Sequence, residues 1–379
     1  MATNLGISIQ ASEPLVSGGG YLGSVQPDSY SHTLQAIGGY WQAQININLP
    51  QQTIEEWLER GLGRHIEVFN DAGVMIFEGF VNQIDANIGN LSIQRGELLS
   101  VGNRANITYG TIDTSTSPPT LGIRITTDTA NDTDSQGKYG IIERYLSTGG
   151  STATIAEQLR DTYLAEYKEA ETRQSLNLSG GSLNLGLTVL GYIHWAKSYI
   201  FNDTSATGTM NLSDKIEDVL GAELNSIFST DYTNITSNTS AVAAWENNNK
   251  KAWDILTGLV ALGDSSDNRY LLGMYKDRIV HYEAIPTTTE YQGRLSAGKV
   301  ETLTGREVAP YDVKPGKWMF IPDFMIGRTV DTSDLRLDPR NIFIESVTYT
   351  APYTLNIRGG KVDSLSQKLA RLGLSGIGG

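Results

Sequence analysis

Residues 38–109 constrain the fold most strongly, because they alternate apolar and polar side chains and then mark each turn. Apolar residues alternate with amides over residues 40–48, which is the period of a strand with one buried face. Thr53, with Glu56 three residues later, predicts a capping box at the start of a short helix. We therefore expect a folded unit of strands around one helix.

Glycines mark the end of this helix and the hairpin after it. Two β-rich runs, residues 66–69 and 74–84, are joined by a Gly-containing turn, which predicts a hairpin. Residues 91–93 and 98–109 are expected to complete the unit. The residues expected to carry its structure are Trp41 and Trp57 in the core, Gly61 and Gly63 at the helix exit, and Gly73 and Gly79 in the hairpin.

Seven segments, spread over most of the chain, carry a family resemblance. In order they read GGYWQAQININLP, WLERGLGRHIEVFNDAGVMIFEGFVNQI, GNRANITYG, DSQGKYGIIE, AWDILTGLVALGD, NRYLLGMYKDRIVHYEA and VKPGKWMFIPDFM. Together they resemble the tail hub (baseplate hub) proteins of tailed bacteriophages. The resemblance marks Asn103 and Arg104. It implies a homotrimer in which each chain contributes two tube-like barrels, so that three chains match a hexameric tail tube above and a threefold tip or spike below.

Composition agrees with a β-rich structural protein. The chain has 379 residues, enough for two to four domains, with 40 glycines and only 19% charged residues, which favours many turns. Its net charge of −13 argues against a protein that grips phosphate backbones, and is compatible with a channel wall past which DNA slides. With no cysteine, neither disulfides nor thiolate metal sites are available. We expect neither a secretory signal nor a membrane span.

The rest of the chain predicts a second β unit, a helical region and a further β-rich part. A Ser/Thr run ending in Pro118 and Pro119 suggests a boundary before the second unit. Within that unit, a helix over residues 152–172 has an apolar stripe, which is expected to pack on a neighbouring element. The stripe residues are Ile155, Leu159, Tyr163 and Tyr167.

We therefore predict an α+β, mainly β fold with two tube-like β-barrel or sandwich domains, a helical insertion and a further β-rich domain. The expected limits are residues 1–112 for the first tube-like domain and 113–212 for the second. Residues 213–264 are expected to form a helical hairpin with one apolar face on each helix. The first face contains Ile216, Val219, Leu220, Leu224, Ile227 and Phe228, and the second contains Trp253, Leu256, Leu259 and Val260. Strands are expected at residues 270–275 and 279–282, joined by a tight turn at Lys276 and Asp277. Residues 265–379 are expected to form the β-rich domain, ending in a helix that carries Leu365, Leu369 and Leu372.

One segment resembles the twelve-residue loop that binds calcium. It has acidic residues at positions 1, 3 and 12, and Gly137 at position 6, where the backbone must turn. Its candidate ligands are Asp132, Asp134, Gln136 and Glu143. Gln136 departs from the pattern, and the flanks look strand-like and turn-like rather than helical. We interpret the segment as a polar loop between domains and expect no metal or cofactor.

Catalytic patterns are weak. The four histidines are not paired at metal-ligand spacing, and no Gly-x-Ser-x-Gly elbow is present. We therefore expect a non-enzymatic structural protein of the phage tail, assembled in the host cytoplasm. Its expected partners are itself, a tail tube or distal tail protein, a tail-tip or spike protein, and DNA that passes without specific binding. One alternative is a carbohydrate-binding or cell-wall-degrading tip protein, and another is a hexameric tube or distal-tail ring subunit.

Overall fold

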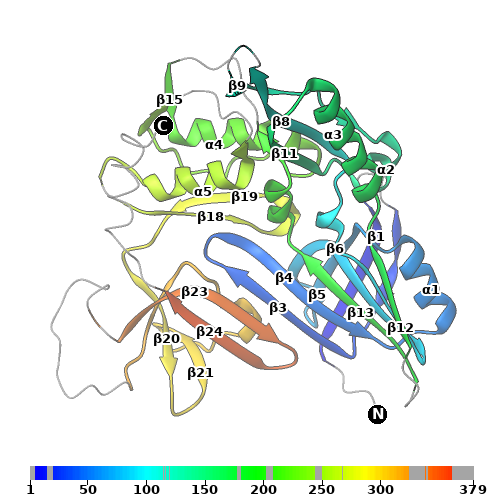
Figure 1. Ribbon diagram of the computed structural model, residues 1–379. Helices are drawn as coiled ribbons and strands as arrows, with labels where there is room; N and C mark the ends of the chain where they lie inside the picture. Colours follow the sequence, from blue (N-terminus) through cyan, green and yellow to red (C-terminus); the bar gives the residue numbers. More distant parts are fainter. Residues whose placement is uncertain are drawn as a thin grey trace.

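The computed structural model describes residues 5–14, 20–113, 115, 117–118, 120–176, 181–201, 208–243, 250–266, 268–323, 338 and 340–360. One 16-stranded sheet forms most of the molecule, and a separate four-stranded sheet lies at one end with α2 and α3 (Figure 1). The helices are α1 (Gln51–Arg60), α2 (Thr133–Tyr139), α3 (Ala153–Tyr167), α4 (Leu212–Gly221) and α5 (Ala252–Leu262). No helix among the described residues is long and apolar enough to cross a membrane.

The large sheet has one main path and three branches. In spatial order its path is β2 (Tyr21–Val25), β1 (Ile7–Pro14), β5 (Arg64–Asn70), β6 (Met75–Gly89), β13 (Ser182–Leu190), β4 (Gly38–Ile47), β3 (Ser29–Gln35), β23 (Asn341–Thr350), β22 (Trp318–Phe320), β20 (Thr289–Arg294) and β21 (Lys299–Thr302). The branches are β7 (Leu91–Gly96) with β12 (Thr172–Leu176), β18 (Tyr270–Met274) with β19 (Val280–Ala284), and β24 (Thr354–Gly360). The predicted α+β, mainly β class is confirmed.

The smaller sheets lie apart from this path. The four-stranded sheet contains β8 (Arg104–Asp113), β9 (Thr120–Thr126), β10 (Ala130–Asn131) and β11 (Glu143–Gly150). Two short pairs complete the structure: β14 (Ile200–Phe201) with β17 (Lys250–Lys251), and β15 (Thr209–Asn211) with β16 (Ala241–Ala243).

Strand β13 completes the N-terminal part of the large sheet by lying between β4 and β6. Residues 98–109 were predicted to complete this part, and they do not. β13 pairs antiparallel with β4 on one side and with β6 on the other. Leu98 and Val101 are buried in the main core, but the chain then leaves the large sheet and β8 pairs with β9, β10 and β11 instead. The alternation in this segment predicted a strand without specifying its partner, because periodicity reports which face is buried and not which strand lies alongside.

The predicted capping box at Thr53 and Glu56 is wrong. Helix α1 begins at Gln51, its N-cap is Pro50, and the cap makes no side-chain hydrogen bond. The backbone amides of Thr53 and Ile54 donate to the carbonyl oxygen of Pro50 at 3.0 and 3.1 Å. Proline can precede the first turn because the first amides of a helix lack intrahelical partners. The helix therefore starts one residue after the proline, and Thr53 lies inside it.

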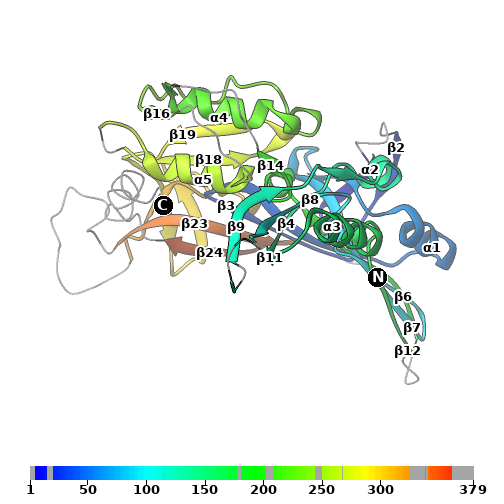
Figure 2. The same cartoon turned by 45° about the horizontal axis from the view of Figure 1, so that its top comes forward.

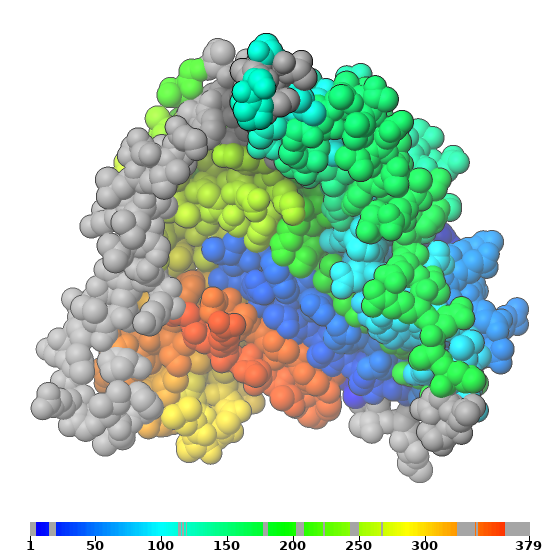
Figure 3. Space-filling model, viewed as in Figure 1, coloured from blue at the N-terminus to red at the C-terminus, as the bar shows by residue number. Residues whose placement is uncertain are grey.

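The C-terminal strands join the N-terminal ones through a single ladder. β23 pairs antiparallel with β3, where Val347 lies opposite Leu34, and Figure 3 shows this orange segment directly against the blue one. The hairpin of β23 and β24 has its own small core around Ile344 and Val347, with Tyr291 and Val313. Strands near both ends of the described chain are therefore part of one hydrogen-bonded structure.

Helices α4 and α5 lie beside the β18–β19 hairpin (Figure 1). Their buried residues include Ile216 and Val219 of α4 and Leu256 and Leu259 of α5, and these belong to the main core. Both helices were expected with these apolar faces. The expected C-terminal helix with Leu365, Leu369 and Leu372 lies outside the described residues.

Strand pairing crosses the predicted limit at residue 112. β12 and β13 belong to the range 113–212, yet they pair with β7, β6 and β4 from the range 1–112. β8 to β11 and α3 form their own small core, with Ile107, Tyr109 and Ala156 buried together. The four-part division of the chain stays a prediction, and the shared strands show how closely its first two parts are joined.

Parts of four strands of the large sheet extend beyond the rest of the molecule, and we call this extension the arm. The arm consists of the distal parts of β6 and β13 together with β7 and β12, in the order β12–β7–β6–β13 (Figure 2). Because β6 is 15 residues long, it continues from the core into the arm without interruption. The arm is therefore a direct extension of the central strands.

We expect Gly79→Ala to destabilise the fold, because a Cβ there would overlap the carbonyl oxygen of Leu190 on β13. The expected loss in the free energy of unfolding, measured by urea denaturation, is about 1–3 kcal/mol. Gly137→Ala in α2 is the matched control, since a Cβ there would have nothing within 4 Å and alanine favours helix. Equal unfolding midpoints for the two variants would contradict the close β6–β13 approach.

Candidate functional site

The residues around Asn103, which the sequence analysis singled out, form a polar joint between the start of β8, helix α2 and the chain that enters β11. The side chain of Asn103 is fully buried and bonds three partners. Its Nδ2 donates to the carbonyl oxygen of Gly140 at 2.7 Å and to Oγ of Ser135 at 3.3 Å, while its Oδ1 accepts from the amide of Ile142 at 2.8 Å. We call this group the Asn103 joint. It fixes the start of β8 against α2 and the chain entering β11.

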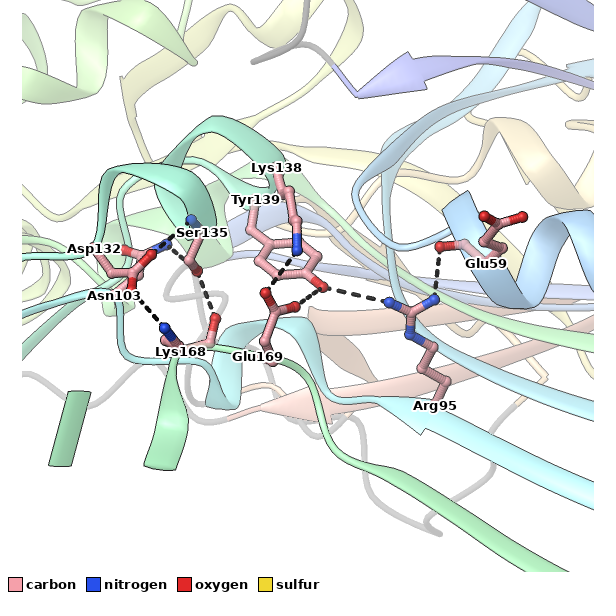
Figure 4. Close-up of polar contacts among 9 residues, drawn as sticks. All are labelled: Glu59, Arg95, Asn103, Asp132, Ser135, Lys138, Tyr139, Lys168 and Glu169. Carbon is pink, nitrogen blue, oxygen red and sulfur yellow. Dashed lines mark hydrogen bonds and ion pairs between the residues drawn. The ribbon is translucent and has the colours of Figure 1, made fainter. Parts of the chain in front are cut away.

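The calcium-like segment folds into this joint as a helix. Asp132 is the N-cap of α2, and its Oδ1 accepts from the amide of Ser135 at 2.9 Å, whereas the sequence predicted no helix beside the loop. The other carboxylate oxygen of Asp132 pairs with Lys168 at 3.0 Å (Figure 4). The Ser135 amide and then Lys168 lower the pKa of the Asp132 carboxyl. Asp132 therefore acts as a helix cap, which explains why an aspartate stands there.

Two of the three remaining candidate ligands, Gln136 and Glu143, are also engaged, and their partners lie on different elements. Nε2 of Gln136 donates to the backbone oxygen of Asn103 at 2.9 Å. Glu143 opens β11 and pairs with Arg104 of β8 at 3.6 Å, while Asp134 lies in the first turn of α2. Across the described ranges, no group of three or more His, Cys, Asp or Glu side chains could hold a metal ion.

A second line of contacts extends the joint to α1. Glu169 accepts hydrogen bonds from Lys138 at 2.7 Å and from the hydroxyl of Tyr139 at 2.9 Å. Arg95 of β7 donates to that hydroxyl at 3.4 Å and to the backbone oxygen of Glu59 at 2.7 Å (Figure 4). It also bonds the backbone oxygen of Leu58. A cation at the last carbonyls of a helix stabilises them. Sequence reasoning did not predict these contacts of Arg95 and Glu169, because they join four elements that are far apart in the chain.

A buried carboxylate and a half-buried arginine form a second joint, between β6 and the turn of the β18–β19 hairpin. Glu78 of β6 is only 4% exposed and lies 3.7 Å from Nε of Arg278, in the turn between β18 and β19. The backbone amide of Arg278 also donates to Glu78 at 3.2 Å, and its guanidinium donates to the oxygen of Ile227 at 3.2 Å. We call this group the Glu78 joint. It connects β6, the hairpin and the chain after α4.

Burial raises the pKa of the Glu78 carboxyl to about 7, although the hydrogen bond and charge of Arg278 oppose the rise. His65 and Glu67 of β5 lie beside it, with His65 bonded to the hydroxyl of Tyr192 at 2.8 Å and to Glu67 at 3.2 Å. A signal for this joint was present in the sequence, because Glu78 is a lone carboxylate within the buried run of β6.

The predicted structural residues lie in different places. Trp57 is buried, with the guanidinium of Arg64 4.5 Å from its ring centre. Trp41 lies at a bulge, opposite the step from Thr33 to Leu34, and is half-buried beside Lys197, whose Nζ is 3.9 Å from its ring centre. Gly61 is the C-cap of α1. Gly63 and Gly73 have φ of 79° and 72°, which glycine adopts without strain.

Comparisons with known proteins give two structural similarities. No protein-family model matches the chain, and no curated protein does. The chain is similar to the prophage MuSo2 43 kDa tail protein from Shewanella oneidensis, with 7% identity over 94% of this chain and 99% of that chain, at a TM-score of 0.43. It is also similar to a tail protein from Neisseria meningitidis MC58, with 8% identity over 96% and 98% of the chains, at a TM-score of 0.42.

We expect Asn103→Ala to loosen the Asn103 joint. The substitution leaves the buried amide of Ile142 and the oxygen of Gly140 without their side-chain partner, which costs about 2–4 kcal/mol. Hydrogen exchange at the Ile142 amide should accelerate in the variant. Gln51→Ala, which removes an exposed hydrogen bond to Glu55, is the control and should leave that exchange rate unchanged. Unchanged exchange in Asn103→Ala would show that the side chain does not hold the joint.

We expect Glu78 to make folding less favourable as the pH rises. Its folded pKa of about 7 exceeds the ordinary 4.5, so its contribution is full below pH 4.5 and is lost as the pH rises through 7. The loss is about 3 kcal/mol. Glu78→Gln should match the native protein near pH 4.5 and exceed it in unfolding free energy at pH 8.

This comparison must be made as a difference between variant and native protein. Burial lowers the pKa of His32 and His194 to about 3. Each therefore contributes stability that is full above pH 6.5 and is lost progressively as the pH falls toward 3. Glu345→Gln, at an exposed pair with Arg358, is the control and should give a flat difference. A flat difference for Glu78→Gln as well would contradict the burial of its charge.

Proposed function

We propose that this chain is a structural tail hub protein of a phage virion. In this role it joins a hexameric tail tube to a threefold tail tip as a homotrimer and forms part of the channel for DNA. The proposal starts from the seven sequence segments that together, and in the same order along the chain, resemble hub proteins. One of these segments contains Asn103 and Arg104. It describes a protein that couples partners of different symmetry and performs no chemistry.

The observation that best supports a coupling role is the continuity of the large sheet. β1 and β24, the first and last described strands, belong to the same 16-stranded sheet, and the β3–β23 pairing connects the two halves of that sheet. Polar contacts then attach the other parts: Arg95 of β7 bonds the hydroxyl of Tyr139 in α2, beside the four-stranded sheet, and the Glu78 joint holds the β18–β19 hairpin. Because buried polar groups are costly to separate, we propose that these parts move little relative to one another.

The charge of the chain is compatible with a channel wall. A net charge of −13 repels the phosphate backbone, so DNA would pass without being held. The oligomeric state, the tube, tip and spike partners, and the place of the chain in the virion are all part of the proposal.

The carbohydrate alternative lacks a structural observation in its favour. A sugar site needs exposed aromatic faces beside carboxylates. The strongly exposed aromatic residues of the described chain lie on separate elements: Tyr21 on β2, Tyr167 on α3 and Tyr353 between β23 and β24. Trp57, Trp195 and Trp318 are buried. We therefore propose the structural role alone.

Native mass spectrometry of the full chain tests the proposal. We expect a species with the mass of three 41.3 kDa chains. Six copies would instead favour a ring subunit of the tube or distal tail, and a stable monomer would contradict the hub. Digestion of purified cell walls by the same sample would support the carbohydrate alternative, and we expect none.

A further inference from the structure

The apolar stripe of α3 faces outward, although its spacing predicted that it would pack on a neighbour. Ile155, Leu159 and Tyr167 are 51%, 47% and 44% exposed, and Tyr163 stacks on Tyr167 with ring centres 4.6 Å apart. The side of α3 that packs on β8 is instead the one with Ala156, which contacts Ile107 and Tyr109. Tyr163 is half-buried with its ring beside Gly102, whereas Ile155, Leu159 and Tyr167 are exposed in the described chain. Repeated exposure of large apolar residues marks a contact surface.

The arm presents a second apolar surface, which the strand registers reveal. Leu176 of β12 lies opposite Leu91 of β7, Leu91 lies opposite Ile88 of β6, and Ile88 lies opposite Leu183 of β13. Residues directly opposite in antiparallel strands share one face of the sheet. These four side chains form a row across the arm, with Leu176 67% and Leu183 43% exposed.

The two surfaces match in size and chemistry. The stripe runs along α3 from Ile155 to Tyr167, and these two residues are about 18 Å apart along the helix axis at 1.5 Å per residue. The row crosses four strands, which is about 14 Å at 4.7–4.9 Å per strand. An apolar helix face laid across an apolar sheet face buries both, as in the two-layer packing of ordinary domains.

The row and the stripe of one chain do not meet. Figure 2 shows the arm extending away from the body and from α3. A surface that matches another surface elsewhere on the same molecule makes a head-to-tail contact between copies, and this contact closes into a ring when the rotation allows it. The occupant that fits the α3 stripe is therefore a second copy of this chain.

We infer that the apolar row of one copy docks on the α3 stripe of the next copy and so closes the ring. The inference rests on the proposed homotrimer, and it adds the two faces that meet. It places Leu176 of one chain beside Leu159 of its neighbour. The contact is formed by side chains that the isolated chain leaves exposed, so removing it affects assembly and leaves the fold of the chain intact.

Disulfide cross-linking tests the contact, because the chain has no cysteine of its own. The test variant carries Leu159→Cys and Leu176→Cys, and the matched control carries Gln158→Cys and Ser175→Cys, one residue away on the same elements. Oxidised samples are compared on non-reducing gels, with native mass spectrometry of the unmodified chain alongside. A disulfide requires Cα atoms within about 7 Å, so only facing positions react efficiently.

We expect the test variant to form covalent dimers and trimers, with about tenfold more linked product than the control. A native trimer without this cross-link would overturn the docking inference and leave the proposed hub standing. A disulfide formed within one chain would also overturn the inference. A native monomer without linked product would contradict both the inference and the hub.

The single substitution Leu159→Glu gives an independent readout. It should lower the trimer population at a fixed protein concentration, while Gln158→Glu, which adds the same charge beside the stripe, should not. Circular dichroism of both variants checks that the fold is retained. Equal trimer populations in the two variants would overturn the inference.

Discussion

The pairing of β13 with β4 on one side and β6 on the other is the constraint on which the rest of the structure depends. In the sequence β13 follows the four-stranded sheet and α3, so the strands with which it pairs lie more than 90 residues earlier in the chain. Leu185, Leu187 and Val189 of β13 are all essentially inaccessible. The strand fits because glycines at Gly79 and Gly191 let the neighbouring backbones approach closely.

This late central strand determines where the other parts lie. The segment between β7 and β12 leaves the large sheet and returns to it, so the four-stranded sheet is attached through its two crossings and needs side-chain contacts to hold its position. At the first crossing Arg144 of β11 bonds the backbone oxygen of Leu99, and at the second Arg95 of β7 bonds the hydroxyl of Tyr139, which also donates to Glu169. The arm follows from the same arrangement, since β12 and β13 are the strands that return.

Sequence reasoning found local structure well and long-range pairing poorly. The hairpin of β5 and β6, the turn between β18 and β19, and the apolar faces of α4 and α5 were predicted, because each depends on residues close together in the chain. The capping box at Thr53 failed because Pro50 starts the helix earlier. The partner of β8 could not be predicted, since alternation gives a buried face and not a neighbouring strand.

The candidate site was predicted in part. Asn103 and Arg104 were singled out by a resemblance, and the structure shows a buried amide and an ion pair there. Asp132 and Glu143 were noticed for a calcium pattern, but a helix cap and a strand pair occupy those positions instead. Glu78 could be recognised in the sequence as a lone carboxylate within an apolar strand. Its partner Arg278 is 200 residues away, so the pairing could be recognised only in the structure.

Native-state hydrogen exchange on β13 tests the central claim most directly. If β13 is the strand that holds the sheet together, the amides of Leu185, Leu187 and Val189 should exchange only on global unfolding, together with those of β4 and β6. The account would be contradicted if these amides exchanged as fast as those of β9, an edge strand of the four-stranded sheet, while the amides of β4 and β6 stayed protected.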